Sequence, residues 1–302
     1  MTKKVLLLYG GFSAEREVSI SAKDDIANAL KNKRYNVIEH NLQDVWKLIG
    51  IIKEQQPDVV YNGLYGNWGE DGEIQGLLDM LQIPYTHSGL TASNLGMNKH
   101  ITKLIAAYNG VKTAKDEMMS FAEYQKYGSK IAYPHVIKPV SDGSSVGVYI
   151  IKNFAEAEKI NYPNPDTQIL VEEYIDGHEF TVMCLNSKTH VVTELKAKNE
   201  FYDYEAKYTA GLTQHILPAD IAQDVSETCK LYAKIMHKAL GCNVLSRSDF
   251  RYNPEVGVVF LEINTNPGMT SLSLVPEQAK YIGISYEDLC DMLVQNAKCR
   301  RI

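Results

Sequence analysis

The sequence predicts a mixed α/β fold that begins with a parallel sheet and continues into units with antiparallel strands. Over about the first ninety residues, short apolar runs alternate with helical patterns, which is typical of a parallel sheet with helices on its faces. Further along, two β-rich runs flank a turn near Pro254, which indicates a hairpin. A chain of 302 residues is long enough for two or three domains.

The first predicted unit covers residues 1–96. Its strands are expected at Val5–Tyr9, Tyr35–His40 and Val59–Asn62, and its helices at Glu15–Leu30 and Glu73–Leu81. Ligands of parallel sheets bind beyond the carboxyl ends of the strands. Two unusual loops, Gly10–Ser13 and Tyr65–Gly72, follow strands in this unit, so we expect both loops to face a ligand.

Two further units are predicted at residues 97–177 and 178–302. In the second unit we expect helices at Lys99–Asn109 and Phe154–Ile160, and strands at His135–Pro139, Val148–Ile151 and Ile169–Glu173. In the third we expect strands at Phe180–Leu185 and His190–Glu194, helices at Ile221–Leu240 and Tyr286–Gln295, and a helix opened by Pro276. The sequence contains no Pro/Gly linker, so the units should pack against one another.

The predicted hairpin brings two carboxylates, an arginine and an asparagine close together. If Pro254–Gly257 forms the loop, Asp249 lies opposite Glu262 and Arg247 lies opposite Asn264. All four side chains then share one face, because side chains alternate along a strand. A loop shorter or longer by one residue would instead put the two carboxylates on opposite faces.

Two opposed carboxylates indicate a bound cation. Side chains directly across a hairpin lie only about 5 Å apart, and like charges there repel each other. Two carboxylates and an amide oxygen, with no thiolate, suit a hard ion such as Mg²⁺. The neighbouring Arg247 suits a phosphate group. The hairpin therefore predicts metal-assisted phosphoryl chemistry.

Two segments of the second unit carry residues that suit a nucleotide. The Val140–Gly147 loop contains Ser144 and Ser145 and follows Lys138; its backbone N–H groups could cradle phosphates, or it could be a plain hairpin turn. The Glu172–Ile175 strand end could offer its backbone to a purine, with Glu179 taking ribose hydroxyls, or it could be a solvated acidic edge.

Three segments suit the reacting groups. The aromatic loop Phe201–Tyr208 could close over a charged reactant and exclude water, or be held at the surface by aromatic packing. Glu15 could bind an amine, or could cap its helix. In the turn after the hairpin, Gly268 could present its N–H to an oxyanion and Ser273 could bind a carboxylate, or the turn could simply precede a helix.

Bulk composition excludes several classes of protein. A net charge of −6 argues against a general nucleic-acid surface. The five cysteines show no Cys-x-x-Cys spacing, which argues against structural zinc and favours a reducing, cytoplasmic location. No run approaches the roughly 18 apolar residues of a membrane span.

Taken together, five motifs resemble those of the D-alanine–D-alanine ligases, a family of the ATP-grasp superfamily. They are Gly10–Ser19, Gly69–Gly72, Lys138-Pro139 with Gly143–Gly147, Phe201–Tyr208 and Glu262–Thr270. The resemblance runs in order from Val5 to about Val294. It implies an ATP-grasp fold of three domains and ATP-dependent ligation of two D-alanines through an acyl phosphate. The product serves peptidoglycan synthesis, and hence cell-wall biogenesis and cell shape.

The resemblance also implies which residues hold ATP and metal. Lys99 and Lys138 would contact the phosphates, and the loop with Ser144 and Ser145 would cover the γ-phosphate. The Glu172, Tyr174 and Ile175 edge would hold adenine, with Glu179 on the ribose. Two Mg²⁺ (or Mn²⁺) ions would lie on Asp249, Glu262 and Asn264, and Lys207 would steady the transferred phosphoryl group.

The remaining implied roles concern the amino acids. Glu15, in a set with Ser144 and Tyr208, would take the ammonium group of the first D-alanine. Arg247 and the Gly268 N–H would stabilise the tetrahedral oxyanion. Ser273 and the Leu274 backbone would take the carboxylate of the second D-alanine. The loop at 199–214 would be mobile, and the family implies a homodimer.

One departure from the family pattern concerns Tyr65, where the family often has His before its Gly-Glu-Asp-Gly motif. That His helps to bind the first amino acid, so Tyr65 is assigned to the first subsite and its selectivity is expected to differ. Tyr208 is typical of members that make the dipeptide. The alternatives are an ATP-grasp ligase with a different amino acid in one subsite, and a nucleotide-binding sensor without catalysis.

Overall fold

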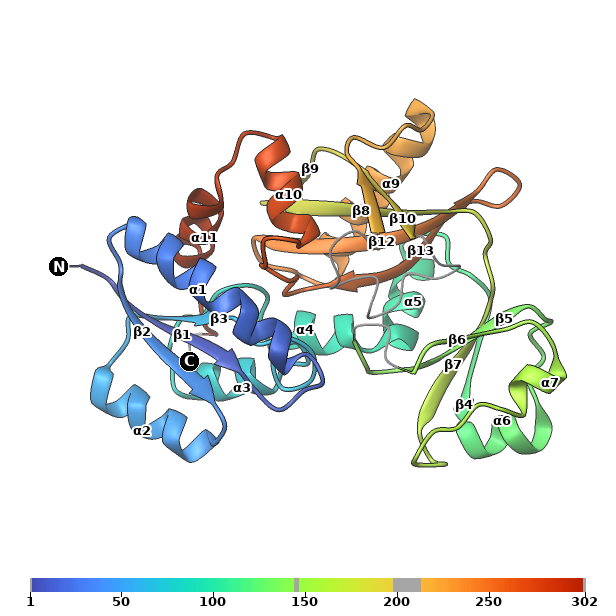
Figure 1. The fold of residues 1–302 in the computed structure, drawn as a ribbon, viewed down its shortest axis with the longest axis horizontal. Coiled ribbons are helices and arrows are strands. Elements are labelled where there is room, and N and C mark those ends of the chain that lie inside the picture. Colours follow the sequence, from blue (N-terminus) through green and yellow to red (C-terminus); the bar gives the residue numbers. More distant parts are fainter. Residues whose placement is uncertain (1, 144–146, 198–212, 301–302) are drawn as a thin grey trace.

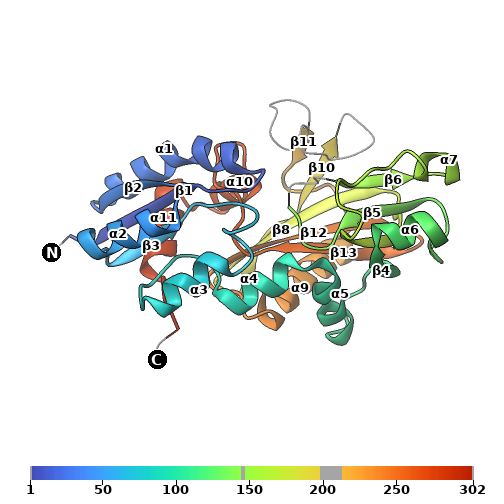
Figure 2. The same cartoon turned by 90° about the horizontal axis from the view of Figure 1, so that it is seen from below.

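The computed structural model describes residues 2–143, 147–197 and 213–300. Its ribbon shows a parallel sheet beside two antiparallel sheets (Figure 1). A view turned by 90° shows the same three groups of strands side by side (Figure 2). In the described residues, no helix is long and apolar enough to cross a membrane.

The N-terminal part is a three-stranded parallel sheet between two layers of helices. Its elements are β1 (Lys4–Gly10), α1 (Arg16–Asn32), β2 (Asn36–Leu42), α2 (Val45–Gln55), β3 (Val59–Asn62), α3 (Glu73–Met80) and α4 (Leu90–Met97). Strand β1 is central and its side chains alternate. Val5 and Leu7 pack on the face covered by α1, whereas Leu6 and Leu8 pack with α2 and α3. The predicted parallel sheet is therefore confirmed.

The second sheet is antiparallel, in the order β4-β7-β5-β6. This part of the chain holds α5 (Lys99–Tyr108), β4 (Asp116–Ser120), α6 (Phe121–Tyr127), β5 (His135–Pro139), β6 (Tyr149–Ile151), α7 (Phe154–Ala157) and β7 (Gln168–Glu173). Ile137 and Val171 form a core with Phe121 of α6. Because strand residues alternate, Lys138 and Glu172 occupy the opposite face of this sheet.

The third sheet is built around β8 and β12, in the order β11-β10-β8-β12-β13 with β9 beside β8. Its elements are β8 (His178–Leu185), β9 (Lys188–Thr189), β10 (Thr193–Ala197), β11 (Thr213–Ile216), α9 (Gln223–Ala239), β12 (Leu245–Asn253), β13 (Gly257–Asn264), α10 (Leu274–Tyr281) and α11 (Tyr286–Gln295). Helix α9 buries Cys229 and Met236 against Phe180 and Phe260, so it covers one face.

Two helices pack outside the sheet of their own segment. Helix α5 precedes the second sheet but contacts α9 and β13, and its Ala106 joins the core of the third sheet. Helix α11 follows the third sheet but contacts α1 and β3, where Leu289 and Leu293 meet Val5 and Leu7. The division into units 1–96, 97–177 and 178–302 stays a proposal, and these two helices tie its parts together.

Several elements differ from the prediction. The helix expected at Phe154–Ile160 ends at Ala157, and the strand expected at His190–Glu194 begins at Thr193. Strands β4 and β11 and helices α2, α4 and α6 were not predicted. Strand β4 reads Asp-Glu-Met-Met-Ser and obtains its order from pairing with the distant β7. Helix α2 had a local signal, because the Asp44 side chain caps its first turn.

The hairpin of β12 and β13 has the predicted pairing of Asp249 with Glu262, but its loop length and register differ from the prediction. Asn253 pairs with Gly257, so the loop has three residues rather than four. The register then shifts between Asp249 and Phe250, because β13 contains one extra residue that forms a β-bulge. Beyond the bulge, Asp249 pairs with Glu262 as predicted. The loop prediction is thus wrong, while the pairing of the two carboxylates is confirmed.

Candidate active site

A cavity lies where loops of all three sheets meet. Eight residues assigned to the site from sequence line it: Glu15, Lys99, Arg247, Glu262, Asn264, Gly268, Ser273 and Leu274. Other residues of the lining were not predicted, among them Glu70, Asp142 and Thr270. The fold therefore brings charged side chains from distant parts of the sequence into one concave site.

The N-terminal wall of the cavity is set by Glu15, which is the N-cap residue of α1 and is buried. Its carboxylate lies directly against Gly143, where a Cβ atom would collide with Glu15 Oε1. Any larger residue at this position would require the Glu15 carboxylate to move. Asn67 Nδ2 also donates to Asp142 Oδ1 at 3.0 Å, so a second contact joins the same two loops.

The opposite wall is the bulged hairpin. Arg247 makes a bidentate ion pair with Asp249, with Nε to Oδ1 at 3.0 Å and Nη2 to Oδ2 at 2.8 Å. Thr181 Oγ1 donates to the same Oδ1 at 2.6 Å. Lys99 Nζ lies 3.8 Å from Glu262 Oε2. Each of the two opposed carboxylates therefore has a cation beside it, as their mutual repulsion requires.

Glu70 is a functional candidate that the sequence analysis missed, although its Gly-Glu-Asp-Gly motif was noted. The side chain lines the cavity and is buried. Burial and the nearby Glu15 carboxylate raise the pKa of Glu70 well above its ordinary value. The motif's position just after a predicted strand of a parallel sheet was the signal that pointed to it.

The replacement of Glu70 by Gln is expected to increase the free energy of unfolding more at neutral pH than at acid pH. A carboxyl whose folded pKa is raised loses stability as the pH rises from its unfolded pKa toward its folded pKa. Gln carries no such penalty, so the difference in unfolding free energy in favour of Gln should grow as the pH is raised from the ordinary carboxyl value of 4.5 to neutral pH. Urea unfolding of both proteins across this range measures it. A constant difference would show that Glu70 stays ionised.

A buried network of charges occupies the face of the second sheet opposite α6. Glu172 lies between two lysines, with Lys103 Nζ at 2.8 Å and Lys138 Nζ at 2.5 Å. Lys103 also pairs with Asp116 at 3.1 Å. Burial opposes ionisation of Glu172, but the two lysines outweigh it and lower its pKa to about 2. The sequence motifs predict a role in ATP binding for Glu172 and Lys138, but they give no signal for Lys103.

The predicted adenine and ribose residues are held by Arg251, which was also not anticipated. Its Nε donates to the Ile175 carbonyl at 3.0 Å, and its Nη1 donates to Glu179 Oε2 at 3.2 Å. Its guanidinium lies 5.9 Å from the centre of the Tyr174 ring. Arg251 thus fixes the segment between the second and third sheets from the side of β12.

The position of Tyr65 gives no support to its assignment to the first amino-acid subsite. It is buried and is not among the described residues that line the cavity. Its hydroxyl instead accepts a hydrogen bond from the Met269 backbone N–H at 3.0 Å. Four other assigned residues, Ser144, Ser145, Lys207 and Tyr208, lie outside the described residues.

The three sheets, with charged groups converging on a cavity between them, define an ATP-grasp fold. Residues 99–295 match the family model for the D-Ala–D-Ala ligase C-terminus, and residues 39–88 match that for the N-terminus. The chain is 42% identical over 302 residues to a D-alanine–D-alanine ligase of Acidiphilium cryptum, covering 99% of each protein. The chain belongs to the D-alanine–D-alanine ligase family.

Solved structures agree with this assignment. The D-alanine–D-alanine ligase of Bacillus anthracis complexed with ATP is 30% identical, with a TM-score of 0.82 over 98% of this chain and 97% of that one. The VanG D-Ala:D-Ser ligase of Enterococcus faecalis is 26% identical, with a TM-score of 0.80 over 98% of this chain and 99% of that one. The likeness therefore extends over nearly the whole of each protein.

Proposed function

We propose that this protein joins two D-alanines in an ATP-dependent, ADP-forming reaction that supplies peptidoglycan synthesis. The observation that carries the proposal is the cavity, where Glu15, Arg247 and Gly268 from distant segments come together. The near full-length match to D-alanine–D-alanine ligases supports it. A cytoplasmic location and a homodimer belong to the same proposal, and light scattering of the purified protein tests the dimer.

In the first step, a carboxylate oxygen of one D-alanine attacks the γ-phosphorus of ATP, which yields an acyl phosphate and ADP. Little covalent chemistry is asked of the protein, so its residues position the reactants and neutralise charge. Lys99 and Lys138 would supply positive charge to the phosphates. Ser144, Ser145 and Lys207 belong to the same proposed phosphate site.

The metal set has the donor chemistry that Mg²⁺ or Mn²⁺ requires. Asp249 and Glu262 are paired across the hairpin, and Asn264 lies two positions beyond Glu262 on the same strand. All three offer oxygen ligands, which hard divalent cations prefer. Bound ions would neutralise the charge that spreads over the transferred phosphoryl group. Arg247 pairs with Asp249 and orients that carboxylate.

Nucleotide binding is proposed for the edge between the second and third sheets. Tyr174 and Ile175 would face adenine there, and Glu179 the ribose. Arg251 supports this proposal because it fixes both the Ile175 carbonyl and the Glu179 carboxylate. Glu172 is proposed for the same nucleotide site, where its carboxylate forms an ion pair with Lys138.

In the second step, the amine of the other D-alanine attacks the acyl carbonyl, and the tetrahedral oxyanion collapses with loss of phosphate. Arg247 and the Gly268 N–H would stabilise that oxyanion. Glu15, with Ser144 and Tyr208, would bind the ammonium of the first D-alanine.

The second D-alanine's carboxylate would lie at the start of α10. Ser273 is the N-cap residue of this helix but makes no side-chain capping bond. Its Oγ instead accepts from the Thr270 N–H at 2.9 Å. The first N–H groups of α10, beginning at Leu274, could therefore bind the carboxylate of the second D-alanine, and the helix dipole also favours an anion there.

The proposed activity is tested with purified protein, ATP, Mg²⁺ and D-alanine. We expect one ADP and one phosphate to be released for each D-alanyl-D-alanine formed, measured by coupled ADP detection and chromatography of the product. L-alanine is the matched control substrate. Nucleotide binding without D-alanine-dependent ADP release would favour the sensor without catalysis.

A second candidate is a ligase that accepts another amino acid or hydroxy acid in one subsite. The likeness to a D-Ala:D-Ser ligase favours it. Competition between D-alanine, D-serine and D-lactate at equal concentration separates the candidates. We expect D-alanyl-D-alanine as the main product, and a predominance of a mixed product would replace this proposal with the second.

A further inference from the structure

We propose that Tyr65 is a positioning residue that holds the oxyanion-binding turn of the active site through the Met269 backbone. This inference rests on the proposed function, because it concerns the turn in which Gly268 would meet the oxyanion. It gives Tyr65 a role outside the amino-acid subsite, in the acyl-transfer half of the reaction.

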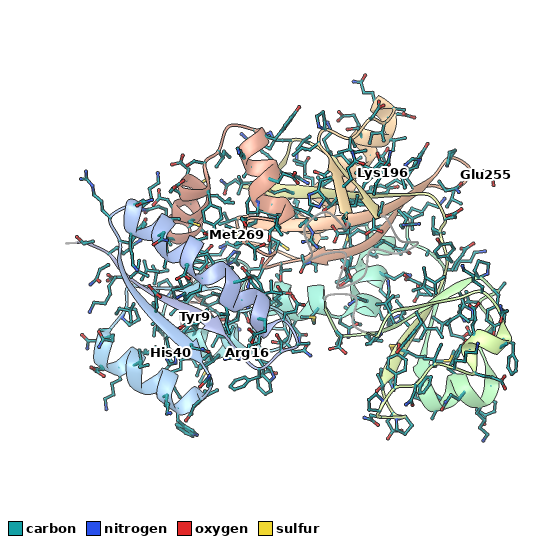
Figure 3. The ribbon with its side chains drawn as sticks, in the orientation of Figure 1. Tyr9, Arg16, His40, Lys196, Glu255 and Met269 are labelled. Carbon is teal, nitrogen blue, oxygen red and sulfur yellow. The ribbon has the colours of Figure 1, made fainter. Side chains whose placement is uncertain are left out.

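Met269 is clamped from two sides by tyrosine hydroxyls. Its backbone N–H donates to Tyr65 Oη at 3.0 Å, and its carbonyl accepts from the Tyr286 hydroxyl at 2.7 Å. Tyr65 comes from the loop after β3, whereas Tyr286 begins α11. Met269 is fully buried and lies between the N-terminal part and α10 (Figure 3). Two parts of the chain distant in sequence thus fix both polar groups of one residue.

A third bond ties the same turn to the same loop. Asn266 Nδ2 donates to the Leu64 carbonyl at 2.8 Å, and Asn266 is buried. Asn266 and Met269 therefore bracket Gly268 with hydrogen bonds to consecutive residues, Leu64 and Tyr65. The N-terminal part therefore holds the segment that contains Gly268 through these hydrogen bonds.

The geometry of the turn makes the position of Met269 matter for Gly268. The peptide group between these residues is planar, so fixing the Met269 N–H also fixes the Gly268 carbonyl and Cα. The Gly268 nitrogen is bonded to that Cα. Gly268 and Thr270 line the cavity on either side of Met269. A Cβ at Gly268 would lie only 3.0 Å from Ser273 Oγ, so the turn packs closely against the start of α10. Loss of the Tyr65 bond leaves a buried N–H unpaired and favours movement of this turn.

The test compares the two half-reactions in Tyr65→Phe. We expect kcat for dipeptide formation to fall about ten- to a hundred-fold, because a small displacement of an oxyanion donor is costly, while KM for ATP stays within about twofold. Formation of the acyl phosphate is followed separately by D-alanine-dependent positional isotope exchange in ATP labelled with ¹⁸O in the β,γ-bridge. Because the variant slows only the second step, the ratio of exchange to net turnover should rise.

Tyr61→Phe is the matched control. Tyr61 is equally buried, and its hydroxyl lies 3.9 Å from Cys290 Sγ, so this variant also loses a buried phenol oxygen but one whose partner is a thiol. It should leave the exchange ratio unchanged. Tyr286→Phe removes the opposite bond to Met269 and should raise the ratio, which keeps the inference testable if Tyr65→Phe is unstable.

Three results would count against the inference. Turnover of Tyr65→Phe equal to that of Tyr61→Phe would overturn it, as would a parallel loss of exchange and turnover, which indicates a merely structural role. Absence of both exchange and dipeptide in the unmodified protein would overturn the proposed function itself. The behaviour of the unmodified protein thus separates failure of the function from failure of the role of Tyr65.

Discussion

Replacing Glu262 by Gln is expected to reduce turnover by roughly 100-fold or more, because a bound divalent cation contributes several kcal/mol to stabilising phosphoryl charge. The carboxylate lines the cavity and its side chain is 30% exposed. Gln keeps the shape but loses the charge, so the free energy of unfolding should change little. Initial rates across a range of Mg²⁺ concentrations, together with urea unfolding, measure both effects.

The matched control for this variant is Glu255→Gln. Glu255 lies in the turn of the same hairpin, is exposed, and projects from its tip (Figure 3), and it does not line the cavity. It should retain full turnover and full stability. If Glu262→Gln turned over at the rate of the control at saturating Mg²⁺, the assignment of Glu262 to the metal would be wrong.

Replacing Lys103 by Met is expected to lower the free energy of unfolding by up to about 3–5 kcal/mol, the usual cost of breaking a buried ion pair by removing one member; Lys138 still pairs with Glu172 and should reduce the loss. The Lys103 side chain is 3% exposed and bridges Glu172 and Asp116. Met matches its length but supplies no charge. Equilibrium urea unfolding at pH 7 measures the loss.

A double replacement separates lost attraction from lost packing. Adding Glu172→Gln to Lys103→Met removes the carboxylate that the first change deprives of one of its two lysines, so the double change should cost less than the sum of the single changes. Strict additivity would mean that the two side chains do not interact.

Acid should weaken the same interaction. The lowered pKa of Glu172 gives stability that is present above the ordinary carboxyl pKa of 4.5 and is lost as the pH falls toward about 2. The difference in unfolding free energy between the unmodified protein and Lys103→Met should therefore narrow over this range.

The bulged hairpin shows how much local pattern can predict. The pairing of Asp249 with Glu262 is right, although the four-residue loop from which it was argued is wrong. The three-residue loop shifts the register by one, and the extra residue of β13 shifts it back. Local sequence constrains a turn only loosely, because several loop lengths suit the same residues. By contrast, the two carboxylates of Asp249 and Glu262 can be read directly from the sequence.

Other parts of the site depend on contacts that the linear sequence does not display. Lys103 reads as one more residue of an amphipathic helix, and its partner Glu172 lies on a different element. Tyr65 was assigned by its position in a motif, but its contact with Met269 arises only once the N-terminal part packs against α10. Motifs thus predicted the residues that meet at the cavity, while the side chains that support them became visible only in the packed structure.

The packing of α11 on the N-terminal sheet has a consequence for how the chain can be divided. Leu289 and Leu293 cover Val5 and Leu7, so the face of the first sheet is completed only by the last helix. Residues 1–96 alone would keep α1 on that face but would expose the part that α11 covers, at a cost that grows with the apolar area exposed. We therefore expect the N-terminal sheet to be less stable by itself than in the whole protein.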